Sequence, residues 1–193
     1  MVCFSFPVCC KKTAVRTMKA PREAWIACGF ELLVTQGPTA VKVDYLCKAM
    51  KLSKGAFYHH FGHLAGYQSA LLDSWEQVHT EAIIAAVSQL EDNAARRELL
   101  TSMANGKDQK LENALRAWAI YSPDVARRLN GVDERRIDFI RQLLEVDAAP
   151  GVDARIAAQV VYAHFVGWQQ MHETLTEQDF ADMEALLKRV LLA

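Results

Sequence analysis

The stretch VDYLCKAMKLSKGAFYHHF, residues 43–61, decides the fold of this 193-residue chain. Val43, Leu46 and Met50 recur at the spacing of one helical face, which predicts a short amphipathic helix over the first half of the stretch. A turn follows at residues 51–52, and Ser53 is a preferred capping residue for a second helix, expected over about 54–59. Two short helices joined by a tight turn are typical of a helix-turn-helix, whose second helix enters the DNA major groove.

The exposed positions of that second helix are candidate DNA contacts. Lysine, tyrosine and imidazole side chains can donate hydrogen bonds to phosphates or bases, whereas small residues allow a helix to approach base edges closely. We expect phosphate contacts from Lys42, Lys54, Tyr58 and His60, and groove contacts from Gly55, Ala56 and His59.

A known family shares this pattern. The residues LSKGAFYHHF (52–61), preceded by LCKAM (46–50), resemble the signature of the tetracycline-repressor (TetR) family of transcriptional regulators. An earlier helix expected over 22–37 also fits, so the resemblance covers residues 20–72. The sequence departs from the family pattern at Lys51, where glycine is usual, at Lys42, where Ser or Thr is usual, and at Leu64, where Lys is usual. The family implies an all-α fold, with an N-terminal three-helix DNA-binding domain and a larger helical domain for ligand binding and dimerisation.

Composition and charge agree with this expectation. The chain is 51% hydrophobic, poor in glycine and proline, and lacks the alternating pattern of strands, which favours an all-helical fold. Residues 1–63 carry nine Lys and Arg against three Asp and Glu, a net charge of +6, whereas the remainder carries 13 against 20, a net charge of −7. A cationic end on an acidic body suits a protein that presents one end to DNA.

The five cysteines do not form a disulfide framework in a chain of this length. Cys28 and Cys47 occupy small apolar positions, which predicts core residues of a reduced, cytoplasmic protein. The Cys9-Cys10 pair lacks an adjacent ligand set for a metal, and Met18 offers an alternative start of translation. No apolar run has the length of a membrane span.

Apolar periodicity predicts further helices beyond the motif. One rod is expected over 64–90, either continuous or bent near His79-Thr80, followed by helices over 94–103, 108–121, 124–146, 153–175 and from 177 onward. Ser122 and Thr176 are expected to cap two of them. Trp75 is expected in the core, whereas charged side chains are expected to reach solvent from Arg116, Arg135 and Arg136. We therefore expect a disordered arm over 1–18, the DNA-binding domain over 19–78 with its motif at 42–61, and the effector-binding and dimerisation domain over 79–193.

The resemblance implies a ligand cavity and a homodimer. Aromatic and polar residues on the helices that surround the cavity in the family are candidates to bind an apolar or aromatic small-molecule effector: Trp118, Tyr121, Tyr162, His164, Trp168, Met171 and His172. The last two helices pair with their copies across a two-fold axis in the family. Heptad spacing of apolar residues in the final helix fits such a pairing: Phe180, Met183, Leu187 and Val190.

The expected function is a homodimeric transcriptional repressor that a small-molecule effector releases from a palindromic operator in double-stranded DNA. No enzymatic activity, cofactor, metal or membrane partner is expected. His59, His60 and His63 could supply metal ligands, but no carboxylate or thiolate converges on them in the sequence pattern. The alternative is a helical adaptor of the same fold without sequence-specific DNA binding, and a salt-dependent affinity for duplex DNA would distinguish the two.

Overall fold

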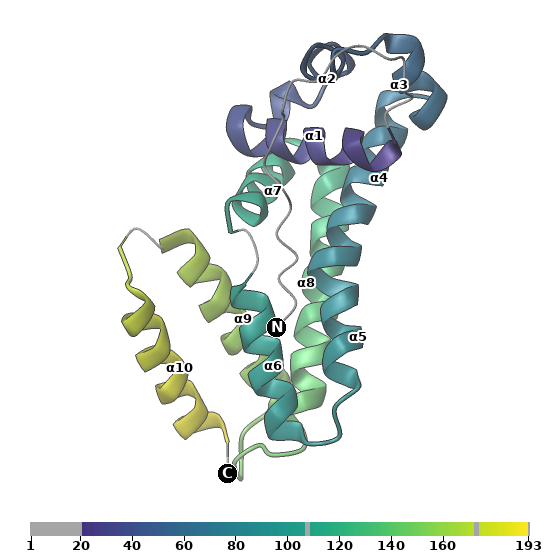
Figure 1. The fold of residues 1–193 in the computed structure, drawn as a ribbon. Helices are drawn as coiled ribbons and strands as arrows, with labels where there is room; N and C mark the ends of the chain where they lie inside the picture. Colours follow the sequence, from purple (N-terminus) through teal and green to yellow (C-terminus); the bar gives the residue numbers. More distant parts are fainter. Residues whose placement is uncertain (1–20, 107–108, 172–173, 193) are drawn as a thin grey trace.

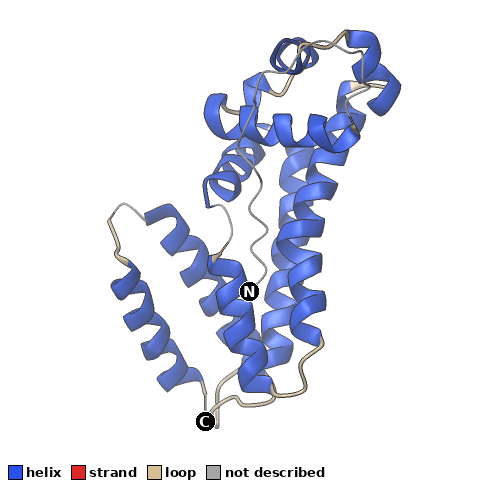
Figure 2. Cartoon of the chain, viewed as in Figure 1, coloured by secondary structure: helices blue, strands red, loops and turns tan. Residues whose placement is uncertain are grey.

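The computed structural model describes residues 21–106, 109–171 and 174–192, and within these ranges it is helical, without strands (Figures 1 and 2). The all-α prediction is therefore confirmed for the described residues. The elements are α1 (Arg22–Gln36), η1 (Pro38–Ala40), α2 (Val43–Met50), α3 (Lys54–Phe61), α4 (Leu64–Glu76), η2 (Gln77–Glu81), α5 (Ala82–Ser88), α6 (Asn93–Asn105), α7 (Gln109–Tyr121), α8 (Pro123–Leu144), α9 (Ala154–Met171) and α10 (Glu177–Leu191). The expected arm over 1–18 lies outside the described residues.

The predicted helix-turn-helix is formed by α2 and α3. α2 ends at Lys51, whose φ of 55° lies in the left-handed region that glycine adopts at lower cost. Ser53 Oγ then accepts a hydrogen bond from the backbone N–H of Ala56 at 3.3 Å, which confirms the predicted cap of α3. Gly37, with φ of 79°, ends α1 as expected. The turn therefore keeps its geometry although it lacks the usual glycine.

The head, defined here as α1, η1, α2 and α3, packs on α4 around aromatic side chains. Trp25 and Phe57 are fully buried and lie edge to face, with 5.6 Å between ring centroids. The hydroxyl of Tyr67 in α4 donates to the carbonyl oxygen of Trp25 at 2.8 Å. Gly29 permits this approach, since a Cβ there would lie 1.9 Å from Tyr67 Oη.

α7 packs against the same hydrophobic core, on the side away from α2 and α3. Leu111, Leu115 and Trp118 belong to the hydrophobic cluster that contains the head core. The head is thus attached to the body through two helices, α4 and α7 (Figure 1). A displacement of either helix would move the head.

The two cysteines expected in the core are consistent with that prediction. Cys47 is buried, Cys28 is half-buried against the head core, and both are free thiols. Burial, with a smaller contribution from Glu31, raises the pKa of Cys28 to about 11. This thiol is therefore protonated and unreactive near neutral pH.

α4 and α5 form one rod interrupted by the π-helical turn η2, at the place where the sequence predicts a bend. A π turn disturbs the regular pattern of backbone hydrogen bonds. Arg136 of α8 donates from Nη2 to the carbonyl oxygen of His79 in this turn, at 3.2 Å. A side chain from another helix therefore stabilises the wide turn.

α8 is the central helix of the body and packs against α7 and α9, with α10 beyond α9 (Figure 1). Thr176 caps α10 as predicted, in a capping box: Thr176 Oγ1 accepts from the N–H of Asp179 at 3.1 Å, and the Asp179 carboxylate accepts from the N–H of Thr176 at 2.7 Å. Ser122 occupies the N-cap position of α8 as predicted, but its side chain forms no capping hydrogen bond.

Candidate nucleic-acid interface and internal cavity

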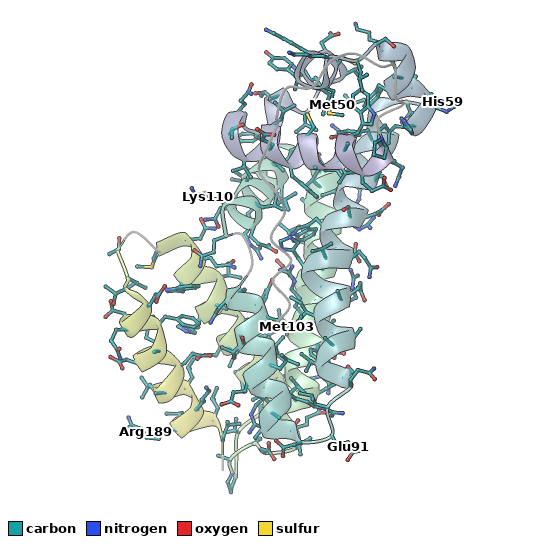
Figure 3. The ribbon with its side chains drawn as sticks, viewed as in Figure 1. Met50, His59, Glu91, Met103, Lys110 and Arg189 are labelled. Atoms are coloured by element: carbon teal, nitrogen blue, oxygen red, sulfur yellow. The ribbon has the colours of Figure 1, made fainter. Side chains whose placement is uncertain are left out.

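α2 and α3 lie at one end of the molecule, opposite the turn between α5 and α6 (Figure 1). Lys54, Gly55, Tyr58 and His59 of α3 are exposed, and Figure 3 shows His59 at the outer edge of the head. Ala56 is only half-exposed, because it packs against the head core. The structure therefore presents one face of α3 outward, and the opposite face, with Phe57, is buried.

Further cations flank this face. Lys42, Lys48 and Lys51 are exposed on α2 and its two ends, and His60 is half-buried at the end of α3. Exposed ammonium groups beside an outward-facing helix are suited to phosphate contact and groove entry. Six of the seven predicted DNA contacts thus lie on α3, and the seventh, Lys42, is the residue before α2.

One acidic side chain lies within this cationic surface. Asp44 Oδ1 of α2 lies 2.6 Å from Lys54 Nζ of α3, and both side chains are exposed. The hydrogen bond to Asp44 and its negative charge raise the pKa of Lys54. The pair partly neutralises the charge of Lys54 and restrains its position, which sequence analysis did not anticipate.

Two other kinds of site find no support in the described residues. They contain no group of three or more His, Cys, Asp or Glu side chains placed to hold a metal ion, and this includes His59, His60 and His63. Across the same residues, no helix has both the length and the apolar character that a membrane crossing requires.

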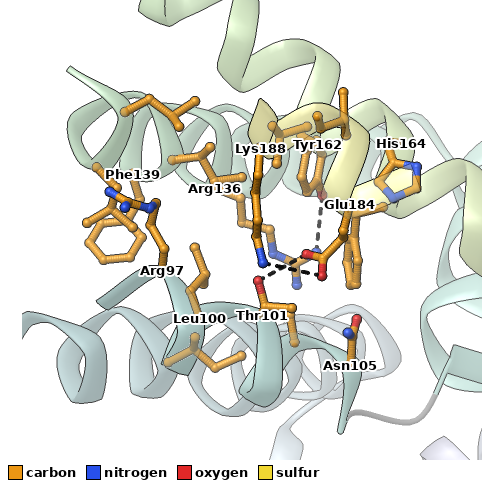
Figure 4. A pocket seen from close by; sticks show the side chains of 18 of the residues that line it. Arg97, Leu100, Thr101, Asn105, Arg136, Phe139, Tyr162, His164, Glu184 and Lys188 are labelled. Carbon is orange, nitrogen blue, oxygen red and sulfur yellow. Dashed lines mark hydrogen bonds and ion pairs between the residues drawn. The ribbon is translucent and has the colours of Figure 1, made fainter. Parts of the chain in front are cut away.

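A cavity lies in the body, bounded by η2, α5, α6, α7, α8, α9 and α10, with a volume of about 160 Å³ (Figure 4). For comparison, an apolar cavity of about 150 Å³ holds a benzene molecule. Most of its wall is apolar, including Ile83, Leu100, Phe139, Ile140, Phe165 and Leu187. The side chains and the volume together fit a small ligand with a hydrophobic body.

The inner end of the cavity, toward the head, is a buried ion-pair network. Arg136 Nη2 lies 2.9 Å from Glu112 Oε1, and Trp75 Nε1 donates to the same oxygen at 3.1 Å. Arg136 also donates to Thr80 Oγ1 at 2.9 Å and to Tyr162 Oη at 3.2 Å. Burial lowers the pKa of Arg136, but the Glu112 carboxylate and Tyr162 more than offset it, so the pKa is raised overall. These contacts join four helices and the π turn.

A second ion pair extends this network along α7 and α8. Arg116 binds the Asp133 carboxylate through two hydrogen bonds, at 2.9 and 3.0 Å, and donates to Tyr162 Oη at 3.1 Å. Tyr162 in turn donates to Asp133 at 2.6 Å. Burial raises the pKa of Tyr162 to about 12, so its hydroxyl stays protonated at neutral pH.

The predicted positions of two arginines are wrong. Arg136 was expected on the outside of α8 but lines the cavity, because the Glu112 carboxylate compensates its charge. Arg116 was expected to extend into solvent but is largely buried, because Asp133 binds it. A sequence signal existed for Arg136, which lies four residues after Val132 and four before Ile140 on the apolar stripe of α8. Arg135, as expected, is exposed, and it pairs with Glu76.

The seven candidate effector residues are distributed over several environments. Tyr162 and His164 line the cavity. Trp168 is buried beside Phe180, with 4.4 Å between ring centroids, and does not belong to the cavity wall. The remaining four lie elsewhere: Trp118 in the head core, Tyr121 with 83% exposure, Met171 with 48% exposure, and His172 outside the described residues.

Apolar side chains also lie on the outer surface of the last two helices. Ile156 and Val160 of α9 are exposed one turn apart, and so are Leu186 and Val190 of α10. Of the heptad residues expected to pair with a second copy, Val190 is exposed, whereas Phe180 and Leu187 face the cavity of their own chain. A Cβ at Gly167 of α9 would meet no heavy atom within 4 Å, so the backbone there is accessible. On each helix, two exposed apolar residues one turn apart form a face suited to contact another protein.

Comparison with known proteins gives one local sequence match. No family model matches the chain. The transcriptional regulator AcuR from Cereibacter sphaeroides is 35% identical over 54 residues, which cover 28% of this chain and 25% of AcuR. The match thus spans about a quarter of the length of that relative.

Solved structures match nearly the whole chain. A regulatory protein TetR from Rhodobacter sphaeroides superimposes with a TM-score of 0.71 at 22% identity, over 88% of this chain and 98% of that chain. A putative transcriptional regulator from Saccharomonospora viridis in complex with choline gives 0.74 at 12% identity, over 89% and 97%. AibR in complex with isovaleryl coenzyme A and operator DNA gives 0.66 at 13% identity, over 88% and 97%. At these identities the likeness shows a shared fold.

Proposed function

From its fold, which is that of TetR-family transcriptional regulators, we infer that this chain is a DNA-binding transcriptional regulator of that family. The observation that carries this proposal is the outward face of α3, where Lys54, Tyr58 and His59 are exposed at the end of the molecule and Ser53 caps the helix. An α-helix fits the major groove of B-form DNA, and this face offers both donors and a small residue, Gly55, for close approach. AcuR, which matches part of the chain, is itself a transcriptional regulator.

We assign the contacts as the sequence predicts them. Lys42, Lys54, Tyr58 and His60 bind phosphates, and Gly55, Ala56 and His59 face the groove. Ala56 is half-exposed, so its methyl group, which is its whole side chain, remains accessible for an apolar contact in the groove. AibR, which has the same fold, was solved with operator DNA.

A homodimer formed by α9 and α10 is part of the proposal. The exposed apolar residues of these helices, with Val160 44% and Val190 57% exposed, would be covered by a second copy. Two heads related by a two-fold axis would read a palindromic site whose half-sites lie about 34 Å apart, one helical turn of DNA. Sedimentation velocity tests this element, and a single species at the 21.6 kDa of the monomer would contradict it.

The regulator is proposed to be a repressor that releases DNA when a small molecule enters the body cavity. The cavity reaches Glu112 on α7, and Leu115 of the same helix lies in the head core. A ligand that binds better to a state with a different position of α7 or α4 would change the distance between the two heads of the dimer, so that they no longer match the operator. The size of this shift is limited by the difference in the ligand's affinity for the two states. We further propose that the protein acts in the cytoplasm, without enzymatic activity.

The test is selection of bound fragments from a random pool of duplex DNA, at moderate salt, by full-length protein whose folding is verified by circular dichroism. Recovery of a palindromic motif is the expected result, and the affinity for it should decrease steeply with salt. Recovery of no motif from folded protein would contradict the proposal. It would favour the alternative function, a helical adaptor of the same fold without sequence-specific DNA binding. The ion pair between Asp44 and Lys54 favours that alternative, because it partly neutralises a cation of the proposed DNA-binding face.

A further inference from the structure

The inner polar end of the cavity cannot bind an anionic ligand without losing contacts of its own. A guanidinium group has five N–H donors. Arg136 makes five hydrogen bonds: one from Nε to Thr80, two from Nη1 to Glu112 and Tyr162, and two from Nη2 to Glu112 and the carbonyl oxygen of His79. Arg97, the arginine at another part of the wall, is paired with Asp147. Arg136, the cation at the inner end, therefore has no donor free for a carboxylate ligand, and the Arg97 charge is already balanced by Asp147.

The outer polar end differs, because it holds acceptors that are not fully used. α6 presents Thr101 and Asn105 from successive turns toward α9 and α10 (Figure 4). Among the described residues, Asn105 Oδ1 and His164 Nε2 are buried and have no hydrogen-bond partner. Buried polar atoms usually have a partner, and both of these residues line the cavity, so they are placed to bind a ligand there.

A carboxylate lies beside these atoms. Glu184 of α10 accepts one long hydrogen bond from Thr101 Oγ1, at 3.3 Å, and its other oxygen lies 3.8 Å from Lys188 Nζ. The side chain of Lys188 is 55% exposed, and such a long, solvent-exposed pair contributes little. Of the two carboxylates in the cavity wall, Glu112 is fully engaged and Glu184 can accept a new donor.

The state of His164 agrees with a donor ligand. Burial lowers the pKa of His164, although the nearby Glu184 acts in the opposite direction, so the imidazole is neutral at pH 7. It adds no positive charge at this end of the cavity. The ring stacks on Phe180, with 4.9 Å between centroids and an interplanar angle of 11°, which fixes its orientation.

We propose that the ligand of this cavity is an apolar amine, with a hydrophobic body against Leu100, Phe139 and Leu187 and a protonated amino group bound by Glu184 and Asn105. An ammonium group has three hydrogen-bond donors and a positive charge. It would give Glu184 the close cationic partner that Lys188, at 3.8 Å, does not provide. The assignment rests on the proposed role of the cavity as an effector site, and it names the chemical class of that effector.

Three probes that share one hydrophobic body test the proposal: 2-phenylethylamine, 2-phenylethanol and phenylacetate. Binding to the full-length protein is measured by isothermal titration calorimetry, without DNA, for the wild type, Glu184→Gln and the matched control Glu98→Gln, an exposed carboxylate on α6 outside the cavity wall. The amine should bind best in the wild type and in the control. Glu184→Gln should weaken amine binding on the order of tenfold to a hundredfold, the loss expected for a hydrogen bond between charged groups, and should leave the alcohol nearly unchanged.

Several results would overturn the proposal. They are phenylacetate as the tightest ligand, equal binding of amine and alcohol to the wild type, no binding of the amine at millimolar concentration, or an unchanged amine affinity in a folded Glu184→Gln variant. The wild-type comparison decides the question even if the variant does not fold. Because calorimetry needs no DNA, amine binding without DNA binding would contradict the proposed function alone, and DNA binding without amine binding would contradict the ligand class alone.

Discussion

Asp44 of α2 and Lys54 of α3 form an ion pair across the helix-turn-helix, with 2.6 Å between Oδ1 and Nζ. The carboxylate lies on the surface proposed to approach phosphates, where it repels them and competes for the ammonium group. We expect Asp44→Asn to bind duplex DNA more tightly, with a salt dependence steeper by about one unit of slope, because one more cation becomes available. Fluorescence anisotropy at several salt concentrations measures both quantities.

The matched control for this charge change is Glu91→Gln, an exposed residue at the end of the molecule far from the head (Figure 3). It should leave DNA affinity unchanged. Weaker binding of Asp44→Asn would mean that the carboxylate is needed to hold Lys54 in position.

Tyr58 is expected to donate its hydroxyl to a phosphate. Tyr58→Phe should weaken binding on the order of tenfold for all DNA sequences alike, because a hydrogen bond to a charged group is lost but no base contact changes. Anisotropy with an operator fragment and with an unrelated fragment measures the effect. Tyr121→Phe, at an exposed position of α7, should bind as the wild type does; an unchanged affinity of Tyr58→Phe would exclude the assigned role.

The contact between α1 and α4 depends on the missing side chain of Gly29. In Gly29→Ala the new Cβ would lie 1.9 Å from Tyr67 Oη, whose hydrogen bond to Trp25 holds it in place. We expect the free energy of unfolding to fall by about 1–3 kcal/mol, measured by urea denaturation. Gly131→Ala is the control, because its Cβ would lie 3.8 Å from the nearest atom, a flexible arginine terminus, and the same change there should stabilise α8 by up to about 1 kcal/mol. Equal effects at both positions would contradict the steric explanation.

The Glu112–Arg136 pair links the cavity to the head. Glu112→Gln removes the negative charge and leaves the Arg136 guanidinium buried without a counterion, so we expect a loss of about 3 kcal/mol in stability. Thermal and urea unfolding followed by circular dichroism measure this loss. Glu134→Gln, an exposed position on α8, should change stability little. A variant as stable as the wild type would show that the pair contributes nothing to the native state.

The half-buried imidazole of His164 predicts a pH dependence of stability. Its pKa is lowered in the folded protein, so the unfolded chain binds a proton first as the pH falls below about 6.5, and stability decreases from there through the lower native pKa. His164→Gln lacks this contribution and should lose less stability on acidification from neutral pH. Urea denaturation at a series of pH values compares the two proteins, and parallel pH profiles would contradict the prediction.

Local features of this fold could be read from the sequence. The caps formed by Ser53 and Thr176 join residues three positions apart, and the end of α1 at Gly37 depends on one residue. The same rule places the start of α8 correctly at Ser122, but no capping hydrogen bond forms there, because such a bond also requires a side-chain conformation that the sequence does not specify.

The polar contacts of the cavity could not be predicted in the same way. Arg136 lies on the apolar stripe of α8, but the sequence does not identify its partner Glu112, which is 24 residues away on another helix. Burying either charge alone would cost free energy, and the ion pair between them offsets this cost. The candidate effector residues Tyr162 and His164 do line the cavity, whereas Trp118 was an equally good aromatic candidate and lies in the head core, because periodicity locates an apolar face but not its neighbour.

The π turn at Gln77–Glu81 has a consequence for the orientation of the head. A π turn accommodates one residue more than a regular α-helical turn, and each residue of an α-helix advances the rotation about its axis by about 100°. The extra residue therefore contributes to the rotation of α4 relative to α5. A one-residue deletion within the turn would rotate α4 by about 100° relative to α5. Because α7 also holds the head, the core shared by α1, α4 and α7 would then have to repack.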